Sequence, residues 1–172
     1  MKRKILIVDG SNLLFQMFFG MPSRIYNEQG IGIWGVLGFV GALLKIVRQT
    51  NPTHLTVLFD GDNENKRTLI NSDYKANRID YSQARDEENP YSQLTYIYQA
   101  LQYLGITYAE TTNCEVDDWI SSYTNLYGKD NEIVVSSFDS DFFQLISDNV
   151  SILSLKLNFA LSLSGLFLCF SK

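Results

Sequence analysis

Three carboxylates lie within four positions of one short stretch, at Glu115, Asp117 and Asp118. The apolar residues around and after them recur at helical spacing, which predicts the start of a helix with one buried face. The positive end of the helix dipole favours anions there, and a single carboxylate is enough to cap a helix. Three carboxylates packed this closely repel one another unless a cation lies among them. Capping and metal binding are therefore both open for this stretch taken alone.

Further carboxylates follow apolar runs elsewhere in the chain. Asp9, Asp60 and Asp139 each come directly after a run typical of a buried strand, and Asp141 lies two residues further on. One aspartate after a strand is most often a turn former. Seven carboxylates at such positions are hard to explain by turn chemistry alone, so we expect them to form one site.

The elements that must position these residues alternate along the chain. Apolar runs predict strands at residues 5–8, 54–59, 106–109, 132–137 and 150–153. Helical patterns fall at residues 11–19, 36–47, 90–104 and 116–127, with a short helix near 142–146. Alternating strands and helices predict an α/β domain with a mostly parallel central sheet flanked by helices. Ligand sites in such domains lie beyond the carboxyl ends of the strands, where the seven carboxylates would converge.

The ligand set at this edge would be made of oxygen atoms only. The single histidine, His54, stands at the start of a predicted strand and fits a structural role better than a ligand role. Hard oxygen ligands favour Mg²⁺ or Mn²⁺ over zinc. Two such ions roughly 4 Å apart can activate a water and stabilise the leaving oxygen of a phosphodiester.

Composition sets bounds on the class of protein. The 172 residues suit one domain, and the formal charge of −5 excludes nucleic-acid binding by bulk positive charge alone. Cys114 and Cys169 form no disulfide framework, which suits a reducing cytoplasm. The apolar run after the basic start is too short for a signal peptide. The apolar tail is interrupted by Lys156 and Asn158, so we expect no membrane span.

The segment from residue 62 to 88 is polar and differs from the rest. It carries the basic residues Lys66, Arg67, Lys75 and Arg78, with Tyr74 among them. Basic residues interleaved with aromatic ones suit a single-stranded nucleic acid, because charges meet phosphates and rings meet bases. Taken alone, the segment is explained more simply as a solvated loop.

These motifs together resemble the 5′-nuclease family, that is, the flap endonucleases of bacteriophages and the 5′→3′ exonuclease domain of bacterial DNA polymerase I. The resemblance is carried, in order along the chain, by residues 7–14, 59–61, 74–78, 115–118 and 139–145. It covers nearly everything from Ile5 to about Leu153. The motifs are specific as a set and weak singly.

The resemblance implies a PIN-like three-layer domain that hydrolyses phosphodiester bonds at DNA 5′ ends or flaps in replication and repair. The implied metal ligands, for two Mg²⁺ or Mn²⁺ ions, are Asp9, Asp60, Glu115, Asp117, Asp118, Asp139 and Asp141. It also implies that Lys75 and Arg78 contact the scissile phosphate as catalytic residues. Tyr74 would stack near the end of the DNA, and Lys66 and Arg67 would bind it. We expect a monomer.

Two features depart from the family pattern. Gln16 stands near a place where the family often has a basic phosphate contact. After Leu153, nothing resembles the helix-hairpin-helix module into which the family continues. We therefore divide the chain into a catalytic domain, 1–153, and an atypical tail, 154–172. Our hypothesis is that the tail is a truncated or out-of-frame ending, which would leave the second metal site incomplete.

Two other functions stay open at this point. A PIN-like ribonuclease would share the sheet and the acidic cluster, although the motif at residues 74–78 argues against it. A catalytically impaired fragment that only binds nucleic acid or a partner would share every motif. Cleavage of flap DNA and of RNA, compared side by side, would distinguish them.

Overall fold

The computed structural model describes residues 2–61, 81 and 83–154, together with the backbone of 159–162 and 165–167. Its centre is a seven-stranded sheet in the order β3-β2-β1-β4-β5-β6-β7. The parallel strands are β1 (Lys4–Asp9), β2 (His54–Asp60), β3 (Thr107–Thr111), β4 (Glu132–Ser136) and β5 (Val150–Ser154). Two short strands, β6 (Phe159–Ser162) and β7 (Gly165–Phe167), add to the β5 edge in antiparallel orientation. The predicted α/β class is confirmed.

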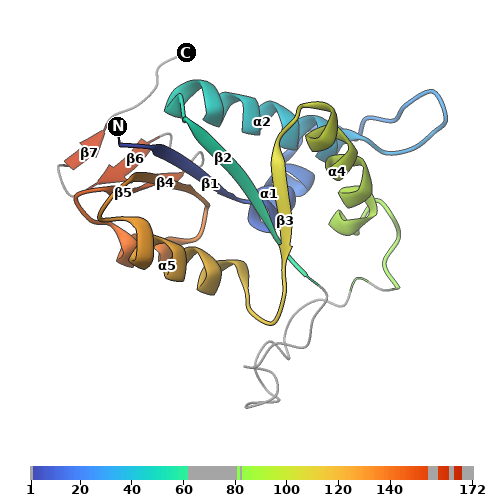
Figure 1. Cartoon of the computed structure of the whole chain (residues 1–172). Coiled ribbons are helices and arrows are strands. Elements are labelled where there is room, and N and C mark those ends of the chain that lie inside the picture. The colour runs from blue at the N-terminus through green and yellow to red at the C-terminus, as the bar shows by residue number, and fades with distance from the viewer. Residues whose placement is uncertain (1, 62–80, 82, 155–158, 163–164, 168–172) are drawn as a thin grey trace.

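Helices cover both faces of this sheet (Figure 1). One face carries α1 (Gly10–Gly20), α2 (Trp34–Thr50) and α4 (Leu94–Tyr103), which is preceded by the 3-10 turn η1 (Pro90–Gln93). The other face carries α5 (Val116–Tyr127) and the 3-10 helix η2 (Ser140–Leu145). This is the expected three-layer arrangement.

The central strand β1 supplies apolar side chains to both layers. Leu6 and Val8 pack into the core shared with α1, α2 and α4, whereas Ile5 and Ile7 pack into the core shared with α5. Successive side chains of a strand point to opposite faces, so a continuous aliphatic run is what a strand covered on both sides requires. Burial of β1 on both faces fixes the position of its carboxyl end.

Gly10 makes the sharp turn from β1 into α1. A Cβ atom at this position would lie 2.7 Å from the Phe59 ring and 2.8 Å from the carbonyl oxygen of Leu58. These contacts are closer than real Cβ atoms approach, and one of them is backbone that cannot rotate away. The absence of a side chain therefore lets α1 start directly against β2.

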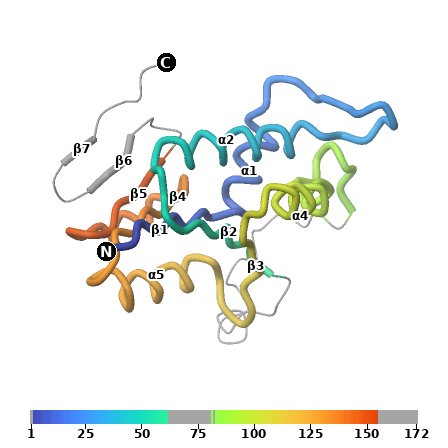
Figure 2. Tube along the Cα trace, turned by 45° about the horizontal axis from the view of Figure 1, so that its top comes forward, coloured from blue at the N-terminus to red at the C-terminus, as the bar shows by residue number. Residues whose placement is uncertain are grey.

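The observed boundaries of several elements, which are labelled along the trace in Figure 2, differ from the predicted ones. The proline-led start at residue 90 forms a 3-10 turn before α4, and β3 begins at Thr107, so Glu110 lies inside the strand. There its carboxylate accepts a hydrogen bond of 2.6 Å from the Tyr98 hydroxyl. Within the apolar tail, the described residues 159–162 and 165–167 form the short strands β6 and β7.

The basic segment that holds Lys66, Arg67, Tyr74, Lys75 and Arg78 lies outside the described residues. The roles expected for these residues therefore stay predictions. Within the described part of the chain, no helix combines the length and apolarity that crossing a membrane would need.

Candidate metal centre at the carboxyl edge of the sheet

Parallel pairing brings the ends of four strands to one edge of the sheet. Val8 lies opposite Ser136 of β4, Asp9 opposite Leu58 of β2, and Asp60 opposite Thr111 of β3. The chain leaves each of these strands at the same edge, and α1, α5 and η2 begin there. All seven predicted carboxylates therefore belong to the carboxyl edge, as expected for this type of sheet.

Asp9 and Glu115 are the two most buried of the seven carboxylates, with 8% and 7% of their surface exposed. It is the last residue of β1, and its Oδ1 accepts a 2.9 Å hydrogen bond from the backbone N–H of Asn12. Its Oδ2 accepts a 3.0 Å hydrogen bond from the Ser137 hydroxyl. Two segments far apart in sequence thus fix both oxygens of one carboxylate.

The pKa of Asp9 is raised from 3.8 to about 7. Burial is the largest cause, because it penalises the charged form. The hydrogen bonds from Asn12 and Ser137 lower the pKa, whereas the negative charges of Asp60 and Asp139 raise it further. The electrostatic influence of these two carboxylates shows that three strand ends share one negative region.

Asp60 links β2 to the start of α5. Its Oδ1 accepts a 3.0 Å hydrogen bond from the backbone N–H of Val116, the first residue of α5. Its own backbone N–H donates to the Ser11 hydroxyl over 2.8 Å. The half-buried Asp60 therefore sits between the first turns of α1 and α5.

The three acids of the opening motif are placed at the start of α5. Glu115 is buried immediately before the helix and does not cap it with its side chain, and Asp117 and Asp118 lie half-buried in the first turn. The Asp117 carboxylate accepts a 2.7 Å hydrogen bond from the backbone N–H of Asp118. The predicted helix start is confirmed, and side-chain capping by Glu115 does not account for that residue.

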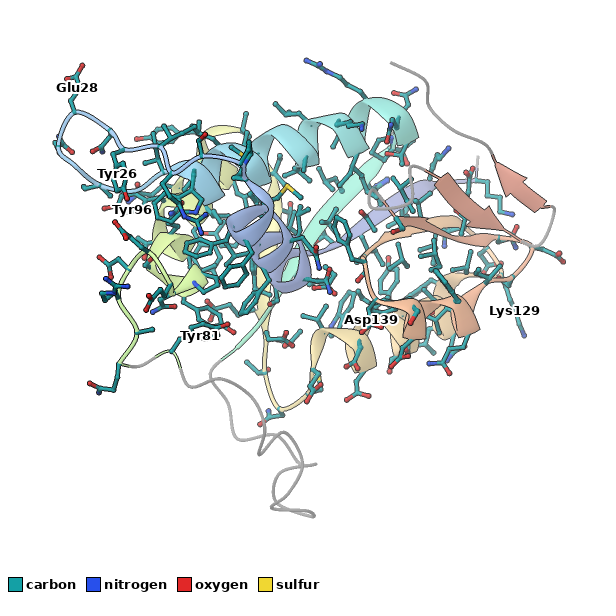
Figure 3. The ribbon with its side chains drawn as sticks, turned by 180° about the vertical axis from the view of Figure 1, so that it is seen from behind. Tyr26, Glu28, Tyr81, Tyr96, Lys129 and Asp139 are labelled. Atoms are coloured by element: carbon teal, nitrogen blue, oxygen red, sulfur yellow. The ribbon has the colours of Figure 1, made fainter. Side chains whose placement is uncertain are left out.

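Asp139 and Asp141 lie at the exposed side of the same edge. The Asp139 carboxylate accepts a 2.9 Å hydrogen bond from the backbone N–H of Asp141 and caps η2. The backbone N–H of Asp139 donates to the Ser137 hydroxyl over 3.2 Å, so Ser137 joins Asp139 to Asp9. Figure 3 labels Asp139 near the start of η2.

The donor chemistry of the edge suits a hard divalent cation. Among the described residues, no Lys or Arg forms an ion pair with Asp9, Asp60, Asp139 or Asp141. The described part of the chain includes no group of three or more His, Cys, Asp or Glu side chains that is already placed to hold an ion. The carboxylates share an edge of the sheet, and the charges of Asp60 and Asp139 act on Asp9. The assignment of all seven as metal ligands stays a prediction.

Three further residues shape the site and were not among the predicted site residues. Ser11, Asn12 and Ser137 hold Asp60 and Asp9 through the hydrogen bonds described above, and the side-chain oxygen of Asn12 also accepts from the backbone N–H of Phe138 over 3.2 Å. Each of them lies within three residues of the end of a strand. A small polar residue just after a predicted strand was the feature of the sequence that could have identified them.

Comparison with known proteins agrees with this architecture. A model of the family "5′-3′ exonuclease, N-terminal resolvase-like domain" matches residues 4–164. The 5′-3′ exonuclease of Bacillus subtilis is 34% identical over 152 residues, which cover 87% of this chain and 50% of the relative. DNA polymerase I of Streptococcus pneumoniae is 30% identical over 86% of this chain but only 17% of the relative. This chain thus matches half the length of the exonuclease and 17% of the length of DNA polymerase I.

Solved structures show the same fold. A bacteriophage T5 protein co-crystallised with metal ions superposes with a TM-score of 0.71 at 23% identity, covering 94% of this chain and 58% of that one. A bacteriophage T5 flap endonuclease in complex with DNA and metal ions gives a TM-score of 0.70 at 23% identity, covering 93% and 58%. At this identity the likeness supports the fold, and the family follows from the match over residues 4–164: the chain belongs to the 5′-3′ exonuclease family through its N-terminal resolvase-like domain.

Proposed function

We propose that this chain hydrolyses phosphodiester bonds at 5′ ends or 5′ flaps of DNA, with Mg²⁺ or Mn²⁺ as cofactor. The observation that carries the proposal is the buried carboxylate of Asp9, which two neighbouring acids, Asp60 and Asp139, make still harder to ionise. Such a group is stable in its charged form when a cation neutralises the region. The family of the chain and the metal ions present with its structural relatives support the same conclusion.

Asp9, Asp60 and Asp139 would hold the first ion, and the remaining four acids would complete a two-ion centre. When bound, such ions activate a water molecule and stabilise the leaving oxygen. The chain's own residues prepare this centre. Ser137 and Asn12 orient Asp9, and Ser11 and Val116 orient Asp60, through the hydrogen bonds described above. This fixed arrangement reduces the reorganisation needed during the reaction.

The DNA strand would be bound by the basic segment that follows β2. Lys75 and Arg78 would contact the scissile phosphate, Tyr74 would stack on a base, and Lys66 and Arg67 would contact the backbone. The sequence motif and the position of the segment directly after Asp60 support these roles. We further propose that the chain works as a monomer in the cytoplasm.

The decisive experiment compares labelled DNA carrying a 5′ flap with matched duplex DNA and RNA, at several concentrations of Mn²⁺ and Mg²⁺. We expect cleavage of the flap substrate that a chelator abolishes, and a higher melting temperature with the ions than without them. Equal cleavage with and without the chelator would refute the metal-dependent mechanism. Preferential cleavage of RNA would instead identify a PIN-like ribonuclease, and binding without cleavage would identify a nucleic-acid binder.

A further inference from the structure

The first turn of α1 contacts the segments that end the strands on both sides of β1. The Ser11 hydroxyl accepts a 2.8 Å hydrogen bond from the backbone N–H of Asp60, at the end of β2. The side-chain oxygen of the next residue, Asn12, accepts a 3.2 Å hydrogen bond from the backbone N–H of Phe138, in the segment after β4. Because β2 and β4 are the two neighbours of β1, these side chains join the two flanking segments through α1. We call Ser11 and Asn12 the brace.

The brace begins where the backbone ladder of β1 ends. Asp9 is the last residue of β1 and lies opposite Leu58, so β2 continues for two further residues, to Asp60. On the other side, the ladder ends with Val8 opposite Ser136. Beyond these levels the first turn of α1 takes the place of β1. The brace then supplies an acceptor to one backbone N–H on each side, which a strand end needs.

The two braced segments carry acids that are proposed to hold the first ion, one on each side of Asp9. The brace bonds the backbone of Asp60 itself and that of Phe138, the residue before Asp139. The strands β2 and β4 are two strand spacings apart in the sheet, or about 10 Å. Oxygen ligands of Mg²⁺ lie about 2.1 Å from the ion. The carboxylates of Asp60 and Asp139 must therefore converge on one ion from backbone positions that the brace sets.

The Asp9 carboxylate is held separately from the brace. Its two oxygens accept hydrogen bonds from the backbone N–H of Asn12 and from the Ser137 hydroxyl. A substitution that shortens the Asn12 side chain keeps that backbone donor. The brace can therefore be removed without removing either hydrogen bond of Asp9, so the two contributions can be measured apart.

We propose that the brace makes the carboxylate site selective for Mg²⁺ over the larger Ca²⁺, by fixing the gap between Asp60 and Asp139. Mg²⁺ demands short bonds in near-ideal octahedral geometry, whereas Ca²⁺ accepts longer bonds in flexible geometry. A gap that is free to widen therefore costs Mg²⁺ more affinity than Ca²⁺. Ser11 and Asn12 are positioning residues, since they act through the segments that they hold. This inference rests on the proposed function in one respect, that the carboxylates bind a divalent ion.

The test measures ion binding by the full chain without DNA. Thermal melting is followed while Mg²⁺ or Ca²⁺ is added at fixed ionic strength. The shift from the ion-free melting temperature of the same variant gives the half-saturating ion concentration. Each variant is its own reference, so a general loss of stability does not enter the comparison. Ser11→Ala and Asn12→Ala each remove one arm of the brace, and Ser11→Thr keeps the hydroxyl.

Asn149→Ala is the matched control. The Asn149 side chain also joins two segments, because its amide donates to the Lys129 carbonyl over 3.3 Å and its oxygen accepts from the Lys2 ammonium. It is half-buried, as Asn12 is, but it lies just before β5, at the opposite edge of the sheet. Its loss removes a similar cross-link far from the carboxylates.

We expect each alanine substitution in the brace to raise the half-saturating Mg²⁺ concentration by about tenfold or more, the usual cost of losing a group that supports a metal ligand. The half-saturating Ca²⁺ concentration should rise by less than about threefold, because Ca²⁺ tolerates a looser site. Ser11→Thr and Asn149→Ala should keep the wild-type values for both ions. Because the two arms are tested separately, Ser11→Ala gives the answer if Asn12→Ala does not fold.

Several results would overturn the proposal. Equal losses for Mg²⁺ and Ca²⁺ in the brace variants would show general support of the site without ion selectivity, and unchanged affinities would show no role at all. The same change of preference in Asn149→Ala would exclude a local cause. A wild-type chain that neither ion stabilises would refute the proposed metal site and this inference with it. A wild-type chain that cleaves no DNA, with the expected change of ion preference in the variants, would refute the proposed activity and support the inference.

Discussion

The two halves of α1 are built from opposite kinds of residue. At its start, Asp9, Ser11 and Asn12 form hydrogen bonds to β2 and to the segment after β4. Further along, Phe18 and Phe19 pack edge to face, and Trp34 and Arg24 contact the Phe18 ring. One helix thus has a polar half that faces the carboxyl edge, next to Asp9, and an aromatic half that contacts Arg24 and Trp34.

The difference shows how each half tolerates change. The polar half depends on hydrogen-bond donors at fixed positions, and the charged form of the adjacent Asp9 is destabilised by burial and by neighbouring charges. Removing one donor there leaves a buried polar group without its partner. The aromatic half depends on packing, in which ring edges can shift with a modest loss of energy. The effects of substitutions in the two halves should therefore differ in kind as well as in size.

The largest effect should come from Asp9→Asn, which removes the central charge and keeps the shape. Cleavage should fall by about a hundredfold or more, because the proposed first ion would lose the most buried of its three proposed ligands. The shift of the melting temperature by Mn²⁺ should disappear as well. The control is Asp130→Asn, an exposed acid just beyond the other end of α5. Undiminished Mn²⁺ stabilisation in Asp9→Asn would contradict the placement of the metal.

The pH dependence of the metal-free protein should sharpen the same contrast. The pKa of Asp9 lets the folded chain hold this proton up to about pH 7, whereas the unfolded chain releases it near pH 3.8. Between these values the folded state binds more protons, so the free energy of unfolding should fall as pH rises, by about 4 kcal/mol in total. Urea unfolding in chelator at several pH values measures this slope. Asp9→Asn should remove this contribution, and an identical slope in that variant would exclude Asp9 as its source.

Gly10→Ala tests the turn that joins the polar half of α1 to the sheet. The added Cβ would meet the Phe59 ring and the Leu58 carbonyl, so the free energy of unfolding should drop by about 1–3 kcal/mol. Gly41→Ala in α2 is the matched control, since a Cβ added at Gly41 would meet no atom within 4 Å among the described residues. That change should raise the free energy of unfolding by up to about 1 kcal/mol. A loss in the control as large as that in Gly10→Ala would contradict a local steric cause.

The smallest effect should come from the aromatic half, in Arg24→Lys. The Arg24 guanidinium lies 4.7 Å from the Trp34 ring centroid and 5.4 Å from that of Phe18, and it donates to the Phe18 carbonyl over 2.8 Å. Lysine keeps the charge but loses the planar contact, so we expect a loss of about 1 kcal/mol in urea unfolding. Cleavage and Mn²⁺ stabilisation should not change. Altered metal binding in this variant would show that the two halves are coupled.

Much of the fold could be predicted from local pattern. Continuous aliphatic runs such as Ile5 to Val8 indicated strands buried on both faces, because only a sheet covered by helices on both sides accommodates them. The boundaries of the helices and strands were harder to predict from the sequence. The start of α4 became a 3-10 turn, and Glu110 fell inside β3, where tertiary contacts with Tyr98 decide its environment.

The location of the carboxylates at one edge of the sheet was predictable from the sequence, whereas their hydrogen-bond partners were not. Acids directly after strands share an edge in any parallel sheet, so the neighbourhood of Asp9, Asp60 and Asp139 followed from order along the chain. That Ser137 bonds Asp9 depends on β4 lying beside β1, which no local pattern specifies. The meeting of Phe15 with Tyr81 and Tyr91 is likewise a contact between segments distant in sequence.

By itself, the sequence determined which residues could do chemistry and which type of sheet would carry them, because residue type and spacing act over a few neighbours. Only the tertiary structure decided the strand order, the raised pKa of Asp9 and the packing of Phe15 on Tyr81 and Tyr91. The physical reason is that burial and charge interactions depend on distances in space, and those distances are set when all the strands pair at once.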